Sequence, residues 1–169
     1  AAFHLAKEGH KVAVVEKESK EQIKPCGGGM AASVQEWFPF DLRPSVEQVI
    51  SRVEFSWCLD DPVIAELPGS APFWIVRREK LDGLLLNNAI NAGAEIICPF
   101  ITTQLSKEGD LWQIKDKNNR KLEARAIVIA NGSNSTFPSE LGLGPRKQHH
   151  ASTTSVRLEG RGNLSEGTS

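Results

Sequence analysis

The sequence predicts an α/β fold with parallel strands, because two helix-like segments are each followed at once by a short apolar strand. Residues 1–8 carry small and apolar side chains on one face, and the Val-rich residues 11–16 follow them. Residues 78–92 form the clearest helical pattern, and residues 94–98 are again apolar. A glycine stands just after each helix, where helices commonly stop. Repeated helix-to-strand units are typical of α/β domains.

A third apolar run, residues 126–130, has the continuous hydrophobicity of a strand buried on both faces. The three runs are therefore expected to be parallel neighbours that form the core of one sheet. In that sheet, the expected strands are Val12–Glu16, Ala94–Cys98 and Ala126–Ala130.

Strand-like segments separated by turn residues predict antiparallel structure elsewhere. Residues 46–57 and 63–76, which are separated by Asp-Asp-Pro, are expected to form an inserted sheet. Three shorter segments are expected to form a meander, at residues 101–106, 111–115 and 121–123. Residues 19–30 are expected to form a long loop, and residues 149–158 a further strand.

This order of elements predicts two domains. One is discontinuous and comprises residues 1–45 and 77–145. The other is a partial, mainly antiparallel sheet of a substrate domain, formed by residues 46–76 and 146–169. Because the chain opens inside a helix whose small-residue face needs a preceding strand, we expect the sequence to be truncated at both ends.

Composition excludes several classes of protein. With 20 basic and 21 acidic residues, the net charge of −1 is too small to predict binding to nucleic acid. The three cysteines are odd in number and widely spaced, which favours a reducing, cytoplasmic compartment over a disulfide framework. They include no Cys-x-x-Cys pair that would suggest zinc, and no apolar run is long enough to cross a bilayer.

Glu16 ends the first expected strand, where dinucleotide-binding folds place a carboxylate that accepts from the ribose hydroxyls of adenosine. In such folds the acidic residue lies about 20 residues beyond a glycine loop, so that loop would fall just upstream of Ala1. A surface glutamate at a strand end is the alternative reading.

A glycine-rich run after this strand reads Lys-Pro-Cys-Gly-Gly-Gly-Met. In this respect the chain resembles geranylgeranyl reductases and their relatives, within the larger group of FAD enzymes that includes para-hydroxybenzoate hydroxylase. The resemblance implies that Cys26, Gly27 and Gly28 lie beside the flavin ring, with Lys17 and Pro25 among the cofactor-binding residues. Glycines let a backbone approach a flat ring, and a thiol is small enough to sit against it. A flexible glycine loop with one buried cysteine is the alternative.

Two later segments extend the resemblance. The start of the long helix is similar to the family's Arg-x-x-Leu-Asp motif, in which Arg78 takes the place of the arginine that approaches the cofactor. Arg77 remains an alternative, as does a solvated surface charge. The segment Ala-Asn-Gly-Ser-Asn-Ser is similar to the family's Ala-Asp-Gly-x-x-Ser, and Asn131 and Gly132 take the cofactor-binding positions. Asn131 replaces the acidic residue, and an ordinary Asn-Gly turn is the alternative. The resemblance also implies a backbone contact from Ile101 to the adenine.

The resemblance implies a Rossmann-type FAD-binding domain and an oxidoreductase that reduces isolated double bonds of an isoprenoid or other lipid-like substrate, with NADPH or another donor supplying electrons. Cys26 is the candidate proton donor to the alkene.

A lipid substrate would suggest peripheral contact with membranes. A flavin-dependent monooxygenase or halogenase on the same scaffold is the alternative reaction, since fold does not settle chemistry. From another class, the alternative is an inactive fragment or a non-catalytic binding protein, and we expect the fragment alone to be inactive.

Overall fold

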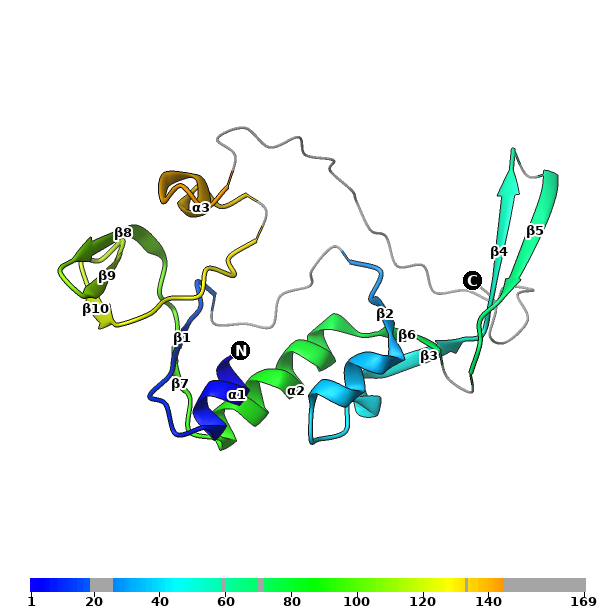
Figure 1. Cartoon of the computed structure of the whole chain (residues 1–169), viewed down its shortest axis with the longest axis horizontal. Coiled ribbons are helices and arrows are strands. Elements are labelled where there is room, and N and C mark those ends of the chain that lie inside the picture. Colours follow the sequence, from blue (N-terminus) through cyan, green and yellow to red (C-terminus); the bar gives the residue numbers. More distant parts are fainter. Residues whose placement is uncertain (19–25, 59, 70–71, 133, 145–169) are drawn as a thin grey trace. The chain divides into compact units, whose positions relative to one another are not determined.

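A computed structural model describes residues 1–18, 26–58, 60–69, 72–132 and 134–144 (Figure 1). The described residues belong to two compact units. The first contains residues 1–11 and 26–94, and the second contains residues 12–18 and 95–144, each with the gaps just given. Helices, a parallel strand pair and antiparallel sheets are all present, which confirms the predicted α/β class. The expected division into two functional domains is a different one and stays a prediction.

The helices of the first unit form where the sequence predicts them. They are α1 (Ala2–Lys7) and α2 (Arg78–Asn91), which contact each other and each bury an alanine, Ala6 and Ala89. Gly93 follows α2 with a φ of 103°, a left-handed conformation that ends a helix at little cost only in glycine. Both helix predictions are confirmed.

A three-stranded antiparallel sheet packs against α2 in the first unit. Its order is β2 (Gly29–Ala31), β6 (Phe73–Val76) and β3 (Val46–Ile50). The buried core joins Trp74 and Val76 of β6 to Leu81 of α2 and to Leu42. Two 3-10 helices, η1 (Ala32–Trp37) and η2 (Arg43–Ser45), connect β2 to β3. Residues 29–30 were expected to belong to a loop. They are instead part of β2, because their backbone pairs with β6 while Met30 packs on the core.

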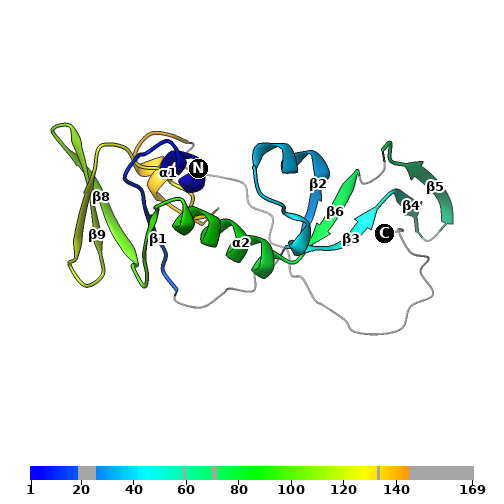
Figure 2. The same ribbon diagram turned by 90° about the horizontal axis from the view of Figure 1, so that it is seen from below.

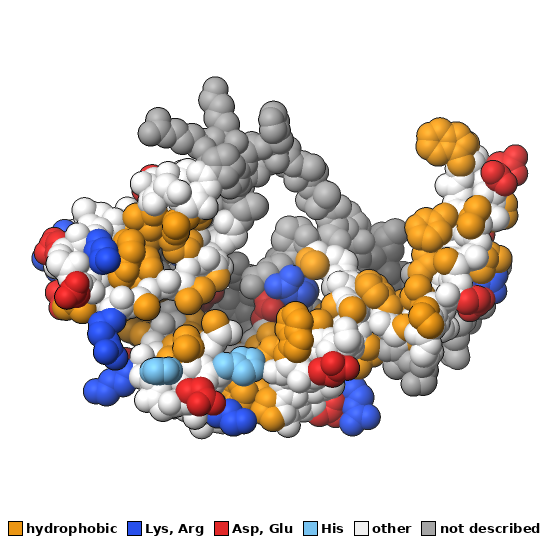
Figure 3. All heavy atoms as spheres, in the orientation of Figure 1, with side chains coloured by type: hydrophobic (Ala, Val, Ile, Leu, Met, Phe, Trp, Pro, Cys, Tyr) orange, Lys and Arg blue, Asp and Glu red, His pale blue; other side chains and the backbone are white. Residues whose placement is uncertain are grey.

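The rest of the inserted region is a hairpin of β4 (Arg52–Trp57) and β5 (Asp60–Glu66), in which Phe55 pairs with Val63. The expected turn at residues 60–62 is wrong, because Asp60 already belongs to β5 and pairs with Trp57 at the end of β4. The chain therefore reverses direction between Trp57 and Asp60, where Cys58 has a φ of 53°. Hydrophobic side chains lie uncovered along this hairpin, among them Phe55, Trp57 and Val63 (Figure 3).

In the second unit, β1 (Ala13–Val15) and β7 (Glu95–Ile97) pair in parallel, with Val14 opposite Ile96. This pairing confirms two of the three strands expected in the sheet core. The third is wrong, because residues 126–130 form no strand and Val128 is 69% exposed. A strand needs a neighbour for its backbone hydrogen bonds, and within the described part of the chain this run has none.

The predicted meander is confirmed in the second unit. Its strands are β8 (Thr102–Glu108), β9 (Leu111–Asp116) and β10 (Lys121–Ala124), paired antiparallel in the order β10, β9, β8, and Figure 2 shows β8 and β9 side by side. The short helix α3 (Phe137–Glu140) follows. The strand expected at residues 149–158 lies outside the described residues.

An ion pair with a buried carboxylate closes the β9–β10 turn. The Asp116 carboxylate is fully buried and accepts hydrogen bonds from the backbone N–H groups of Asn118 and Arg120, both at 2.8 Å, and from Arg120 Nε at 2.7 Å. The Arg120 guanidinium also donates to the Pro99 carbonyl oxygen and lies 5.0 Å from the centre of the buried Phe100 ring. Burial acts to raise the pKa of Asp116, but the hydrogen bonds from Arg120 and Asn118 outweigh it and leave that pKa below its ordinary value.

None of the helices in the described part of the chain has both the length and the apolar character needed to cross a membrane.

Candidate functional site

The loop that carries Cys26 is held against strand β6 by Gly28. The Val76 N–H donates to the Gly28 carbonyl oxygen at 2.9 Å, and Gly28 has a φ of 78°. A Cβ on Gly28 would lie 2.1 Å from the Val76 carbonyl oxygen, so only glycine fits this position. A contact within the chain therefore accounts for Gly28. At Gly27 a Cβ would meet no atom within 4 Å, which leaves room for a ligand beside that residue.

The Cys26 thiol lies between this loop and the first turn of α2. The Gly28 N–H donates to Cys26 Sγ at 3.5 Å, and the thiol is exposed rather than buried. The Gly28 hydrogen bond and, after it, the neighbouring Arg78 guanidinium lower the pKa of the thiol below its ordinary value, because both favour the thiolate. An accessible thiol of lowered pKa can give up a proton more readily at neutral pH than an ordinary cysteine.

Arg78, at the start of α2, is the arginine that faces Cys26. Its guanidinium donates to the Asp82 carboxylate through Nε and Nη2, with each of the three contacts at 3.3 Å. Partial burial acts to lower the pKa of Arg78, but the interactions with Asp82 and Cys26 raise it, so the side chain keeps its positive charge. Arg77 points its Nε to Glu79 at 2.7 Å. Of the two arginines, Arg78 is therefore the one beside Cys26, and its approach to a cofactor stays a prediction.

In the second unit, Glu16 and Ile101 lie close together. Glu16 directly follows β1, and its carbonyl oxygen accepts from the Phe100 N–H at 2.7 Å, one residue before Ile101. One carboxylate oxygen, Oε1, accepts from the Lys17 N–H at 2.8 Å. The Ile101 carbonyl oxygen accepts from the Lys117 N–H at 3.0 Å. The two residues that are expected near the adenosine therefore lie close together in this unit.

The remaining predicted site residues are less informative. Asn131 and Gly132 are exposed, and Gly132 has a φ of 90° in a turn where its carbonyl oxygen accepts from the Ser135 N–H at 3.2 Å. Within the described residues, no hydrogen bond or ion pair joins either of them to Glu16 or Ile101. Lys17 pairs through Nζ with Glu18 at 3.5 Å. Pro25 lies outside the described residues.

Sequence reasoning missed two partners of these residues, Asp82 and Val76. Asp82 carried a usable signal, because an arginine and an aspartate four residues apart on a helix commonly form an ion pair. Val76 carried none, since only the folded chain shows which backbone Gly28 touches.

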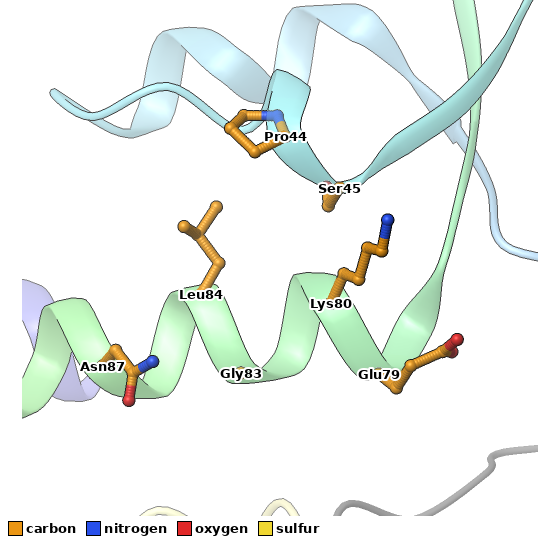
Figure 4. Close-up of a pocket in the computed structure, with 7 residues that line it drawn as sticks. All are labelled: Pro44, Ser45, Glu79, Lys80, Gly83, Leu84 and Asn87. Carbon is orange, nitrogen blue, oxygen red and sulfur yellow. The ribbon is translucent and has the colours of Figure 1, made fainter.

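A shallow hollow elsewhere on the first unit contains none of the predicted site residues. Leu84 and Lys80 extend from α2 toward Pro44 and Ser45 of η2 (Figure 4). The Ser45 hydroxyl is buried and donates to the Leu42 carbonyl oxygen at 2.7 Å, so its hydrogen-bonding capacity is used within the chain.

Comparison with known sequences gives distant relatives. The chain is 26% identical over 157 residues to protein FixC of Salmonella typhi, a match that covers 86% of this chain and 36% of FixC. It is 26% identical over 168 residues to the probable electron transfer flavoprotein-quinone oxidoreductase YdiS of Escherichia coli K12, covering 93% of this chain and 39% of YdiS. The chain thus spans less than two fifths of the length of these relatives. No protein-family model matches it.

Solved structures are similar in fold. The halogenase PltM in complex with phloroglucinol and FAD matches with a TM-score of 0.67 at 17% identity, over 83% of this chain and 33% of PltM. A geranylgeranyl bacteriochlorophyll reductase-like protein from Thermoplasma acidophilum matches with a TM-score of 0.60 at 23% identity, over 74% of this chain and 33% of that protein. The chain therefore shares its fold with part of these structures, which confirms the predicted fold class. Relatives of this fold include both a halogenase and a reductase-like protein, so the fold leaves the reaction open.

The described residues fit such a cofactor in their chemistry. Arg78 is a cation suited to phosphate or carbonyl oxygens, and the space beside Gly27 is open. The Glu16 carboxylate is exposed and can accept hydrogen bonds from ribose hydroxyls.

Proposed function

We propose that the protein is an FAD-dependent oxidoreductase that reduces double bonds of an isoprenoid chain, with Cys26 as the proton donor. The observation that carries this proposal is the accessible Cys26 thiol, which receives the Gly28 N–H and lies beside Arg78. Two of the motifs that resemble geranylgeranyl reductases, the Cys-Gly-Gly run and the start of α2, meet at this thiol, although about 50 residues separate them in the chain. The similarity to flavin-dependent relatives supports the cofactor.

Four residues are proposed to hold FAD. Glu16 would accept from the ribose hydroxyls, with Ile101 offering a backbone contact to the adenine. Arg78 would bind an anionic or carbonyl oxygen, and the open space at Gly27 would admit the ring. If bound there, FAD would supply hydride chemistry at one alkene carbon, with NADPH or another donor as the source of electrons.

Cys26 Sγ would give the proton that the other alkene carbon needs, so that the hydride, which carries two electrons and one hydrogen, and this proton together complete the reduction. The resulting thiolate is stabilised by the Gly28 N–H and by the charge of Arg78, and it regains its proton from solvent because the side chain is exposed.

The test uses the purified full-length protein. An absorption spectrum establishes whether flavin is bound. Anaerobic mixing with NADPH, followed by a geranylgeranyl-bearing substrate, should first reduce the flavin and then oxidise it again as a saturated product forms. A flavin that is never reoxidised by the alkene would refute the proposed reaction while leaving FAD binding intact.

A second candidate is electron transfer to a quinone, which the similarity to YdiS over 93% of the chain favours. In the same experiment, a soluble quinone in place of the alkene would reoxidise the flavin, and Cys26 would be unimportant because no carbon is protonated. The likeness to PltM supports a halogenase or monooxygenase as a further alternative, for which reoxidation would require oxygen. A protein without a flavin spectrum would instead be a non-catalytic member of this fold.

A further inference from the structure

We propose that Asp82 is a positioning residue that holds the guanidinium of Arg78 beside the thiol of Cys26. This inference rests on the proposed role of Cys26 and adds the residue that prepares it. Asp82 lies one helical turn after Arg78 in α2, a helix of 14 residues, so its carboxylate has a defined place relative to the arginine.

The contacts between the two side chains leave donors for the thiol. Asp82 engages Nε and Nη2 of Arg78 at 3.3 Å, and a guanidinium has five N–H donors, so others remain available. A long side chain that is 30% exposed would otherwise sample many rotamers. The carboxylate therefore restricts Arg78 to orientations in which it can meet Cys26.

On the other side, Gly28 fixes the thiol. Its close approach to the Val76 carbonyl oxygen holds the loop on β6, while its N–H donates to Sγ. Among the described residues, the charged side chains that act on Cys26 are Arg78 and Asp82, both from α2, and the loop contributes the Gly28 N–H. Among the described residues, the groups that act on the thiol are thus one fixed backbone N–H and one ion pair.

The two roles open to Asp82 predict opposite results. As a mere negative charge, Asp82 disfavours the thiolate, so its removal would lower the pKa of Cys26 further. As a positioning residue, it keeps the stronger interaction of Arg78 in place, so its removal would raise that pKa. We expect the second result, because the carboxylate holds the guanidinium at 3.3 Å and the positive charge of Arg78 favours the thiolate.

The experiment measures how the rate of Cys26 alkylation by iodoacetamide depends on pH, in protein with Cys58→Ser and Cys98→Ser. Asp82→Asn should move the midpoint of the profile to higher pH and slow alkylation about twofold to fivefold below it, the range expected when a partly exposed ion pair is lost. Arg78→Met should have at least this effect. The double variant should match Arg78→Met alone, because Asp82 acts through Arg78.

Two variants control for folding and general charge. Asp82→Glu, which keeps the carboxylate, should restore much of the profile, and Glu79→Gln, which removes the partner of Arg77, should leave it unchanged. A midpoint that stays in place or moves to lower pH in folded Asp82→Asn protein overturns the proposal. The assay needs neither FAD nor alkene, so its outcome is independent of whether the protein reduces isoprenoids.

Discussion

Each of the two units contains an arginine and an aspartate four residues apart, and the two pairs differ in geometry. In the second unit, Arg120 and Asp116 meet at 2.7 Å, and the Asp116 side chain is 0% exposed. In the first unit, Arg78 and Asp82 meet at 3.3 Å, and their side chains are 30% and 33% exposed. The same residue types at the same spacing thus form one tight pair with an enclosed carboxylate and a 46% exposed arginine, and one loose pair in which both side chains are about a third exposed.

The difference indicates what each pair does. Asp116 has its carboxylate oxygens bound by Arg120 and by two backbone N–H groups, which leaves it little capacity for a ligand. Arg78 divides its guanidinium between Asp82 and Cys26 and remains reachable from solvent. We therefore expect changes at the Asp116 pair to affect stability and changes around Arg78 to affect chemistry.

The largest effect is expected when the thiol beside Arg78 is removed. Cys26→Ser raises the donor's pKa far above that of a thiol, and Cys26→Ala removes the donor. Because positioned acid catalysis contributes about a hundredfold to ten-thousandfold, both variants should reduce the alkene slowly while FAD stays bound. Stopped-flow spectroscopy should show normal reduction of the flavin by its donor and slow reoxidation by the alkene. Parent rates in both variants would leave Cys26 a packing residue only.

A smaller effect, on FAD affinity, is expected at Glu16. Its carboxylate is exposed, whereas the carboxylate of Asp116 is enclosed. Glu16→Ala removes a charged acceptor for the ribose hydroxyls and should weaken FAD binding about tenfold to a hundredfold. Fluorescence titration of flavin-free protein measures this affinity. Glu123→Ala, at an exposed position of β10, is the matched control and should bind FAD as the parent does. Equal affinity of the Glu16 variant and the control would contradict the assignment.

A moderate loss of stability is expected when the enclosed pair is broken. Arg120→Leu leaves the buried Asp116 carboxylate without its counter-charge, and the melting temperature should fall by several degrees. Arg78→Leu should change it little, because ion pairs that are a third exposed contribute about 0 to 1 kcal/mol. Thermal unfolding followed by circular dichroism compares the two variants. If Arg78→Leu is the more destabilising, the contrast between the pairs is wrong.

The smallest effect is expected in the loss of stability at acidic pH. The folded pKa of Asp116 is lowered, so the pair's contribution to stability is present above the ordinary aspartate pKa of about 3.9 and is lost as pH falls through the lower folded value. The Asp116→Asn variant should be less stable than the parent at neutral pH. When the pH is lowered, its stability should fall by less than that of the parent. Melting temperatures measured from neutral pH down to about pH 2 test this slope. Parallel curves for parent and variant would show that Asp116 contributes no acid sensitivity.

Sequence patterns predicted the elements whose signals are local. Helix α2 followed from its apolar stripe and Gly93, and the meander followed from alternation between turn residues. The prediction for residues 126–130 failed because apolar composition specifies burial but not a hydrogen-bonding partner. In the site, the motifs indicated Cys26 and Arg78 separately, and the fold brings them together. Asp82 was within reach of a spacing argument, whereas the contact of Gly28 with Val76 depends on tertiary structure.

The central claim is that Cys26 lies at the flavin, and a protection experiment tests it most directly. Protein with and without bound FAD is treated with iodoacetamide, and mass spectrometry follows alkylation of each cysteine. We predict that FAD slows alkylation of Cys26 severalfold and leaves Cys58, in the turn of the β4–β5 hairpin, unaffected. Alkylation of Cys26 at the same rate in both forms would contradict the claim.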